Sequence, residues 1–173
     1  MRILPATPDR FAAILDLNEA FVDVLAPLSR ERLELLDSRA SYHRVAVDED
    51  ELAGFVLAFG SDTRHDSVNF RWFAARYPSF LYVDRVVVSS RWQGAGVGRR
   101  LYRALFAFAR RAGYEQLTCE IDADPPNPRS ERFHEAFGFR EVGSQQVRYA
   151  GGKPKRVSLR AVPLARPAAP RAT

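Results

Sequence analysis

Hydrophobic residues along this chain change their spacing from one segment to the next, and each spacing predicts a different element. Between Val97 and Ala112 they recur every three or four residues, which is the spacing of a helix with one buried face. Between Tyr114 and Asp122 they alternate with polar residues, which is typical of a strand. The same tests predict further helices over 8–25, 29–36 and 129–137, and further strands over 1–4, 42–47, 51–59, 80–89, 139–149 and 155–162.

The order of these elements limits how they can be assembled. The polar turn at 48–50 joins two strands and therefore predicts an antiparallel hairpin. The strand, helix and strand over 80–122 predict a parallel pair with a right-handed crossover. We predict the α/β (α+β) class, with one domain over 1–162 whose mixed, mostly antiparallel sheet has helices on both faces. The tail over 163–173 is rich in Pro and Ala, and we expect it to be flexible.

A glycine-rich loop separates the strand over 80–89 from the helix that follows it. Gly94, Gly96 and Gly98 alternate with small residues there, so the backbone can turn tightly and present its N–H groups. Unpaired N–H groups at a helix N-terminus attract negative charge, and Arg99 and Arg100 add positive charge beside them. The stretch predicts a phosphate-binding loop, and the alternative is a tight turn that binds no ligand.

The spacing of this loop discriminates between phosphate-binding motifs. A P-loop requires Lys followed by Ser or Thr after its last glycine, and a dinucleotide motif requires a glycine where Arg99 stands. The spacing Q-x-x-G-x-G, formed by Gln93, Gly96 and Gly98, resembles instead the acyl-CoA-binding loop of the GNAT superfamily of N-acyltransferases. That resemblance implies that backbone amides of the loop hold the CoA pyrophosphate.

The same resemblance implies a binding site for the rest of acetyl-CoA. The central parallel strands are expected to splay apart and admit it, and a backbone N–H of Val86 or Val88 is expected to donate to the thioester oxygen. The cofactor-binding residues implied in the first motif are Val86, Val87, Val88, Gln93, Gly94, Ala95, Gly96, Val97, Gly98 and Arg99.

A second segment, which runs from Asn127 to Phe139 and contains a Gly-Phe pair, resembles another characteristic stretch of the superfamily. It implies that Asn127 and Ser130 are hydrogen-bond partners of the pantetheine arm or the phosphates. His134 stands where the superfamily often has a tyrosine that acts as general acid toward the departing thiolate. A histidine can donate a proton near neutral pH, so we expect His134 to be that acid. The alternative is that His134 packs or pairs structurally.

Acidic residues on two neighbouring strands are candidates for the general base. The acceptor amine must lose a proton before it attacks, and a carboxylate can take it directly or through water. Asp84 is the first candidate, because it stands where related enzymes often carry an acidic residue. Glu120 and Asp122 are the next candidates, on the adjacent predicted strand. The alternative for Asp84 is that it pairs with an arginine and only shapes the pocket.

The resemblance implies an acetyl-CoA-dependent N-acetyltransferase that acts on a primary amine by direct attack on the thioester. The acceptor is then a small-molecule or peptide amine, and the acidic residues favour a cationic one. A different reading is a CoA-binding sensor or partner protein without transferase activity, which the missing tyrosine keeps open.

The segment over 60–79 is unusually long and polar for a connection inside a compact domain. Such loops often carry function, so we read it as a lid or wall over the acceptor site. The alternative is a surface excursion packed by its own aromatic residues. Asn18, Glu19 and Phe21 are further candidates for substrate contact. His65 within the long segment and His43 on a predicted strand lack metal-ligand spacing, and we expect no metal.

Composition sets the remaining limits. The 173 residues suit one domain, and no apolar run is long enough to span a membrane, so we expect no membrane partner. The single cysteine, Cys119, excludes an internal disulfide, and we expect a cytoplasmic protein with Cys119 in its core. The net charge of +5 favours an anionic ligand such as CoA. Because the arginines are scattered we expect no nucleic-acid partner, while a homodimer is left open.

Overall fold

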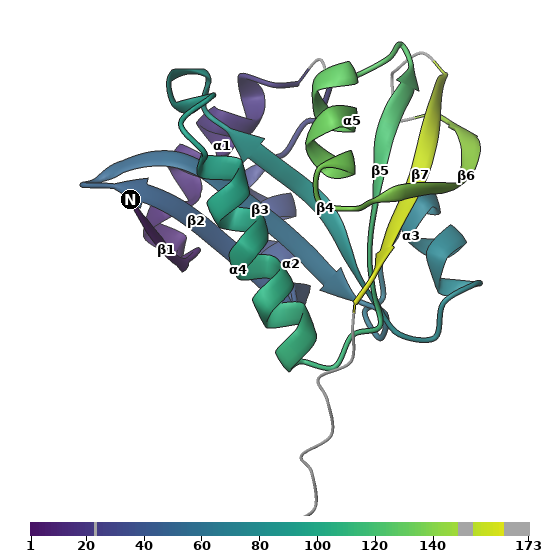
Figure 1. Ribbon diagram of the computed structural model, residues 1–173. Helices are drawn as coiled ribbons and strands as arrows, with labels where there is room; N and C mark the ends of the chain where they lie inside the picture. The colour runs from purple at the N-terminus through teal and green to yellow at the C-terminus, as the bar shows by residue number, and fades with distance from the viewer. Residues whose placement is uncertain (23, 149–153, 165–173) are drawn as a thin grey trace, which may run out of the picture.

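One seven-stranded sheet runs through the whole molecule (Figure 1). The computed structural model describes residues 1–22, 24–148 and 154–164. Neighbouring strands are antiparallel except β4 and β5, which are parallel as the sequence predicts. In spatial order the strands are β1 (Arg2–Pro5), β2 (Tyr42–Asp48), β3 (Glu51–Gly60), β4 (Phe80–Val88), β5 (Gln116–Asp124), β7 (Lys155–Pro163) and β6 (Arg140–Val147).

Helices cover both faces of this sheet, which confirms the predicted layering. Leu101 and Leu105 of α4 are buried against the face that is turned to the viewer in Figure 1, where α5 also lies. Phe11 of α1 and Phe73 of α3 are buried against the opposite face. The helices are α1 (Phe11–Glu19), α2 (Arg30–Arg39), α3 (Val68–Ala74), α4 (Val97–Arg111) and α5 (Pro128–Glu135), with short 3-10 turns at Pro8–Arg10 and Ser90–Trp92.

The first helix is shorter than its apolar stripe predicts. α1 ends at Glu19, whereas the stripe continues to Leu25. Phe21 and Leu25 still pack against the same core cluster as α1, although a turn rather than helix carries them there. The buried Asn18 holds this turn, because its amide donates to the carbonyl of Ala26 at 3.3 Å.

A bulge at Asp84 breaks the alternation of β4. The register shifts because Leu57 pairs with Arg85 and the next residue of β3 pairs with Val83, which leaves Asp84 as the additional residue. Strict alternation would place Val86 on the same face as Tyr82, and this prediction is wrong. Val86 instead joins Val83 in the cluster under α4, while Tyr82 packs on the other side. The extra residue of a bulge re-aims its side chain, here toward the centre of the molecule.

The parallel strands β4 and β5 splay apart, as expected. Their pairing ends at Tyr82 opposite Thr118, although β4 continues to Val88 and β5 to Asp124. Figure 1 shows the two arrows diverging toward their carboxyl ends. Between them lies a cavity of about 1580 Å³, which we call the central hollow.

Single residues explain several details of the fold. Ser29 caps α2, since its hydroxyl accepts from the backbone N–H of Arg32 at 3.1 Å. Gly54 marks a close approach of two strands, because a Cβ there would lie 2.6 Å from the carbonyl oxygen of Val87. Cys119 is buried in the core, as expected.

The end of the described chain differs slightly from expectation. β7 includes Pro163, and Leu164 is buried and donates its backbone N–H to Glu115 at 2.8 Å. Residues 149–153 and 165–173, which include most of the tail predicted over 163–173, lie outside the described residues. Among the residues that are described, no helix is both long and apolar enough to cross a membrane.

Candidate active site

The N-terminus of α4 opens onto the central hollow with its backbone amides unpaired. Gly96 is the N-cap residue, with a left-handed φ of 79°, and no side chain caps the helix. The first amide bonded within the helix is that of Arg100, which donates to the carbonyl of Gly96 at 3.1 Å. The amides of the first turn therefore remain available, and together with the helix dipole they favour an anion.

Neighbouring side chains hold this glycine loop in place. Gln93 donates its amide to the carbonyl of Val88 at 3.3 Å and accepts a hydrogen bond from Arg129 of α5. Gly98 allows α4 to approach α5, because a Cβ there would lie 3.1 Å from the ring of Phe133. Asn127 caps α5 by accepting from the backbone N–H of Ser130 at 3.1 Å, so its side-chain oxygen is already engaged.

The central hollow brings nearly all sequence-predicted site residues together. Of the residues predicted to be catalytic or cofactor-binding, only Ala95 is not part of its lining. The residues that do line it are Asp84, Val86, Val87, Val88, Gln93, Gly94, Gly96, Val97, Gly98, Arg99, Glu120, Asn127, Ser130 and His134. The arrangement places an anion-binding helix terminus, two carboxylates and the open edge of β4 around one space.

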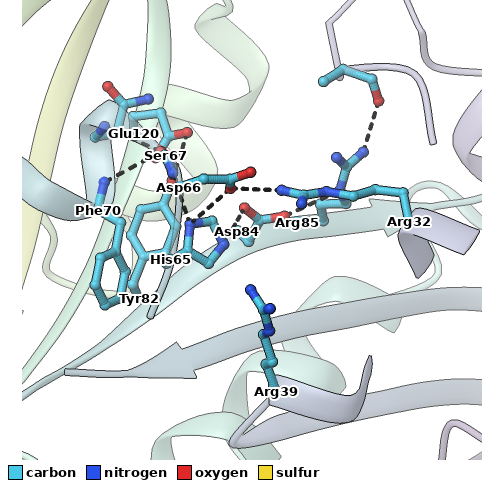
Figure 2. Close-up of polar contacts among 12 residues, drawn as sticks. Arg32, Arg39, His65, Asp66, Ser67, Phe70, Tyr82, Asp84, Arg85 and Glu120 are labelled. Atoms are coloured by element: carbon cyan, nitrogen blue, oxygen red, sulfur yellow. Dashed lines mark hydrogen bonds and ion pairs between the residues drawn. The ribbon is translucent and has the colours of Figure 1, made fainter. Parts of the chain in front are cut away.

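Asp84 lies between two nitrogen donors (Figure 2). Nε of Arg85 is 3.1 Å from Oδ2 of Asp84, and Nε2 of His65 is 3.4 Å from Oδ1. The histidine contact is at ion-pair distance and falls short of a well-aligned hydrogen bond. Burial opposes ionisation of Asp84, but His65 and Arg85 outweigh it and lower the pKa of the carboxyl below its ordinary value. Asp84 is thus held as an anion.

His65 is fixed by the backbone that follows it. Its Nδ1 accepts the backbone N–H of Ser67 at 3.1 Å, so the neutral ring carries its proton on Nε2, toward Asp84. The ring packs against Phe59, Phe70 and Tyr82. The segment over 60–79 is therefore both packed by its own aromatic residues and part of the wall of the hollow, to which His65 and Ser67 contribute.

Glu120 has the opposite electrostatic character to Asp84. Tyr82 donates its hydroxyl to Oε1 of Glu120 at 2.9 Å, and the Ser67 hydroxyl lies 3.4 Å from the same tyrosine oxygen. The pKa of Glu120 rises to about 7, because burial disfavours its charged form and the nearby Asp84 charge adds repulsion. Hydrogen bonds from Tyr82 and Asn69 act in the other direction. A carboxyl that titrates near neutral pH suits a proton acceptor.

His134 is held between two partners inside the protein. Its Nδ1 lies 2.7 Å from the carbonyl oxygen of Ser130, so it carries the proton and donates. Its Nε2 lies 2.7 Å from the hydroxyl of Tyr102 and accepts from it. Burial lowers the pKa of His134 to about 4. The ring is therefore neutral near pH 7, with both of its nitrogens engaged, and this geometry favours a structural role over that of an acid.

The remaining candidates have clear positions. Asp122 forms an ion pair with Lys155 of β7 at 2.9 Å, so its carboxylate already has a cationic partner. Phe21 lines the hollow, whereas Asn18 is buried and accepts from Arg85 at 2.7 Å. Glu19 is not among the lining residues. Among the described residues, no group of three His, Cys, Asp or Glu side chains could hold a metal ion.

Sequence reasoning missed His65, Ser67 and Tyr82 as parts of the site. The contacts that join them to Asp84 and Glu120 bring together β4, β5 and the segment before α3, and no local pattern in the sequence indicates which of their side chains meet. The usable signal was the long polar segment over 60–79, which contains His65 and directly precedes β4.

Comparisons with known proteins agree with this geometry. The Acetyltransferase (GNAT) family matches residues 11–139 of the chain. A curated relative, an aminoglycoside N(6')-acetyltransferase type 1 of Stenotrophomonas maltophilia, is 29% identical over 141 residues, which cover 81% of this chain and 86% of the relative.

Solved structures show the same fold. The protein yncA of Salmonella typhimurium, solved with its cofactor acetyl-CoA, has a TM-score of 0.73 at 23% identity and covers 100% of this chain and 99% of its own. Naa50 of Arabidopsis thaliana, in complex with a bisubstrate analogue, has a TM-score of 0.72 at 12% identity and covers 93% of this chain and 97% of its own. With its mixed sheet, splayed β4 and β5 and family match over most of its length, the chain belongs to the acetyltransferase (GNAT) family.

Proposed function

We propose that this acetyltransferase moves the acetyl group of acetyl-CoA to a primary amine by direct attack on the thioester. One observation carries the proposal. Glu120, whose pKa of about 7 suits a proton acceptor, faces the same hollow as the uncapped N-terminus of α4. The hollow can thus bind a phosphate group at one end and deprotonate an amine at the other.

The residues present fit acetyl-CoA. The free amides of the first turn of α4, together with Arg99, suit its phosphates, and Gln93 and Arg129 hold the loop that presents those amides. The edge of β4 beyond Tyr82 has left β5, so N–H groups near Val86 or Val88 can donate to the thioester oxygen. Acetyl-CoA supplies the acetyl group in activated form.

Glu120 is assigned the base and Asp84 a supporting role. The ammonium of the acceptor gives a proton to Glu120, directly or through water, and the freed amine bonds to the acetyl carbon as the carbon–sulfur bond breaks and CoA leaves as the thiolate. The nitrogen then gives up its second proton, which the thiolate takes directly or through water, so that the products are a neutral amide and CoA. Asp84 remains charged beside Arg85, where it opposes ionisation of Glu120 and helps to keep its pKa near 7. Because their environments separate their pKa values, one carboxyl accepts the proton while the other remains charged.

His134 is assigned to structure rather than to proton donation. A thiol with a pKa of about 8.5 can leave as the thiolate near neutral pH, so the step does not require a strong acid. The bond from His134 to Tyr102 ties α5 to α4, and the bond to the Ser130 carbonyl fixes the ring within α5. α5 and its N-cap residue Asn127 bring Asn127, Arg129 and Ser130 to the hollow.

Ligand-induced stabilisation, followed by release of free thiol, tests this function. Acetyl-CoA and CoA should each raise the melting temperature while NAD should not, because a ligand that binds only the folded state stabilises it by about 2.7 kcal/mol at 100 times its Kd. Amines should then release CoA thiol from acetyl-CoA. A shift with CoA but no thiol release with any amine would favour the non-catalytic CoA-binding alternative. No shift with either form would refute the assignment of the α4 loop.

A further inference from the structure

The acidic side chains around the acceptor side of the central hollow are mostly neutralised by the protein itself. Asp84 pairs with Arg85 at 3.1 Å, and Asp122 pairs with Lys155 at 2.9 Å. Asp66 pairs with Arg32 of α2 at 2.6 Å. Each of these carboxylates already has a cation beside it and offers little to a positively charged ligand.

Glu120 is the exception inside the hollow. Among the described residues, no Lys, Arg or His nitrogen lies within ion-pair distance of its carboxyl oxygens, and Oε1 accepts a hydrogen bond from the Tyr82 hydroxyl. Asp124, which also has no ion-pair partner there, is exposed at the end of β5. The interior of the hollow thus offers one position for one cationic nitrogen, and Arg32 and Arg148 on its lining repel further positive charge.

The mouth of the hollow on this side is apolar. Val24 and Val68 are 45% and 47% exposed, and they are two of the four large hydrophobic side chains that the described residues expose. Both line the hollow, together with Phe21, Leu25 and Pro27 of the connection between α1 and α2. Exposed apolar groups gathered at the entrance of a binding site mark the place where a ligand buries its own apolar surface.

Side chains also restrict the size of the acceptor. Figure 2 shows Arg32 reaching from α2 to Asp66 close to Asp84, which joins α2 to the segment that carries His65. This ion pair forms a wall beside the carboxylates. Since Glu120, Val24 and Val68 all line the hollow, a compact ligand with its nitrogen at Glu120 would have its body near the two valines.

We propose that the acceptor is a small primary monoamine with an apolar body, an alkylamine or arylalkylamine, and that Val24 and Val68 select it. This inference rests on the acetyl transfer proposed above and names its substrate class. Such an amine matches the single position for a cation and the apolar mouth. A polyamine or an aminoglycoside carries further ammonium groups, and within the hollow these would meet carboxylates that are already paired.

A panel of amines tests the substrate class with the full chain and saturating acetyl-CoA. Phenylethylamine and hexylamine represent the proposed class, spermidine and kanamycin represent polycations, and a short peptide with a free N-terminal alanine represents protein acceptors. We expect kcat/KM for phenylethylamine or hexylamine to exceed that of every other acceptor by at least tenfold. A higher kcat/KM for spermidine, kanamycin or the peptide would overturn the substrate class while leaving acetyl transfer in place. Transfer to no amine at all would overturn the proposed function as well.

Surface substitutions test the two valines without endangering the core. Val24→Asp and Val68→Asp should each raise KM for phenylethylamine about tenfold with little change in kcat, and calorimetry with CoA present should show the same loss of phenylethylamine affinity. Val142→Asp is the matched control, because Val142 is similarly exposed on β6 but does not line the hollow. Unchanged KM and affinity in both Val24→Asp and Val68→Asp, or an equal loss in Val142→Asp, would contradict the selection by Val24 and Val68.

Discussion

Asp84 and Glu120 are carboxyl side chains of neighbouring strands in one hollow, yet their surroundings move their pKa values in opposite directions. Asp84 stands beside Arg85 and His65, which favour its charged form. Glu120 is buried beside a tyrosine hydroxyl and feels the charge of Asp84, which disfavours its own ionisation. The difference arises from partners rather than from residue type, and it supports the assignment of Glu120 as the base.

The rate of acetyl transfer should follow the titration of Glu120. We expect kcat/KM to rise with pH and level off above about 7, where Glu120 is deprotonated. Glu120→Gln should lower kcat by a factor of about 100 to 10,000 and abolish the rise of kcat/KM between acidic pH and pH 7. Glu34→Gln, which removes an exposed carboxylate of α2, is the control and should retain the wild-type profile. If kcat/KM of Glu120→Gln still rose with pH and levelled off near pH 7, another group would be the base.

The same pKa should make stability depend on pH. Native Glu120 keeps its proton up to about pH 7, whereas the unfolded chain releases it near 4.5, so the native state binds more protons between these values. The contribution of Glu120 to stability is therefore fully present below pH 4.5 and is lost as pH rises through 7. Relative to Glu120→Gln, the wild type should lose on the order of 3 kcal/mol across this window, as urea unfolding at several pH values would measure. A pH-independent difference between the two proteins would contradict the raised pKa.

His134 should matter more for stability than for chemistry. His134→Phe removes the buried bonds to Tyr102 and Ser130 and should cost about 1–3 kcal/mol, because the groups left behind lose their partners. We expect kcat to stay within about tenfold of wild type, since a thiolate leaving group needs little acid assistance. Urea unfolding and steady-state kinetics measure the two effects. A loss of kcat greater than a hundredfold with unchanged stability would return His134 to the role of general acid.

At the scale of elements, α4 combines an amphipathic body with an uncapped N-terminus. Its apolar side holds the helix against the sheet, and Gly96 directs the first amides toward the hollow with a left-handed φ. Gly113, just beyond the other end of α4, also has a left-handed φ of 81°. At both glycines, an added Cβ would meet no heavy atom within 4 Å. The two positions therefore differ in location but not in local strain.

This pair separates ligand binding from helix stability. Gly96→Ala and Gly113→Ala should each cost about 1–2 kcal/mol, because alanine is strained in the left-handed region. Only Gly96→Ala should also weaken CoA binding, by about tenfold in a calorimetric titration, because it disturbs the amides that face the phosphates. Equal CoA affinity in the two variants would argue against phosphate binding at the N-terminus of α4.

At the scale of the whole molecule, the sheet consists of two parts that meet over a short stretch. β1 to β4 form one part and β5 to β7 the other, and they are paired only near Phe80 to Tyr82. Beyond that stretch the strands separate around the central hollow. A ligand between them would take the place of strand pairing at the centre of the sheet.

CoA binding should therefore protect the splayed edges from amide exchange. We expect slower exchange over 83–88 of β4, over 120–124 of β5 and in the first turn of α4, because a ligand there covers the backbone and suppresses local opening. β2, which lies away from the hollow, should change little. Hydrogen exchange followed by mass spectrometry with and without CoA measures this. Protection spread evenly over the sheet would argue against a ligand between β4 and β5.

Properties that depend on neighbours in the chain were determined by the sequence itself. The apolar spacing of α4, the glycines before it, the Ser29 and Asn127 caps and the strand order around the crossover all follow from local chemistry. The two motifs and the carboxylates were enough to predict the family, the splayed strands and fourteen of the residues that line the hollow. These signals are readable because helix and strand periods, caps and turns involve residues close in sequence.

Only the tertiary structure decided how those residues behave. The bulge at Asp84 arises from register with β3, the early end of α1 follows from the bonds of Asn18, and the contact of His65 with Asp84 joins two separate elements. The pKa of Glu120 is raised by burial, whereas that of Asp84 is lowered by His65 and Arg85, and this difference favours Glu120 as the proposed base. The hydrogen bond that occupies Nε2 of His134 comes from Tyr102 of another helix. Charge, burial and partner geometry are properties of the assembled fold, because residues distant in sequence supply them.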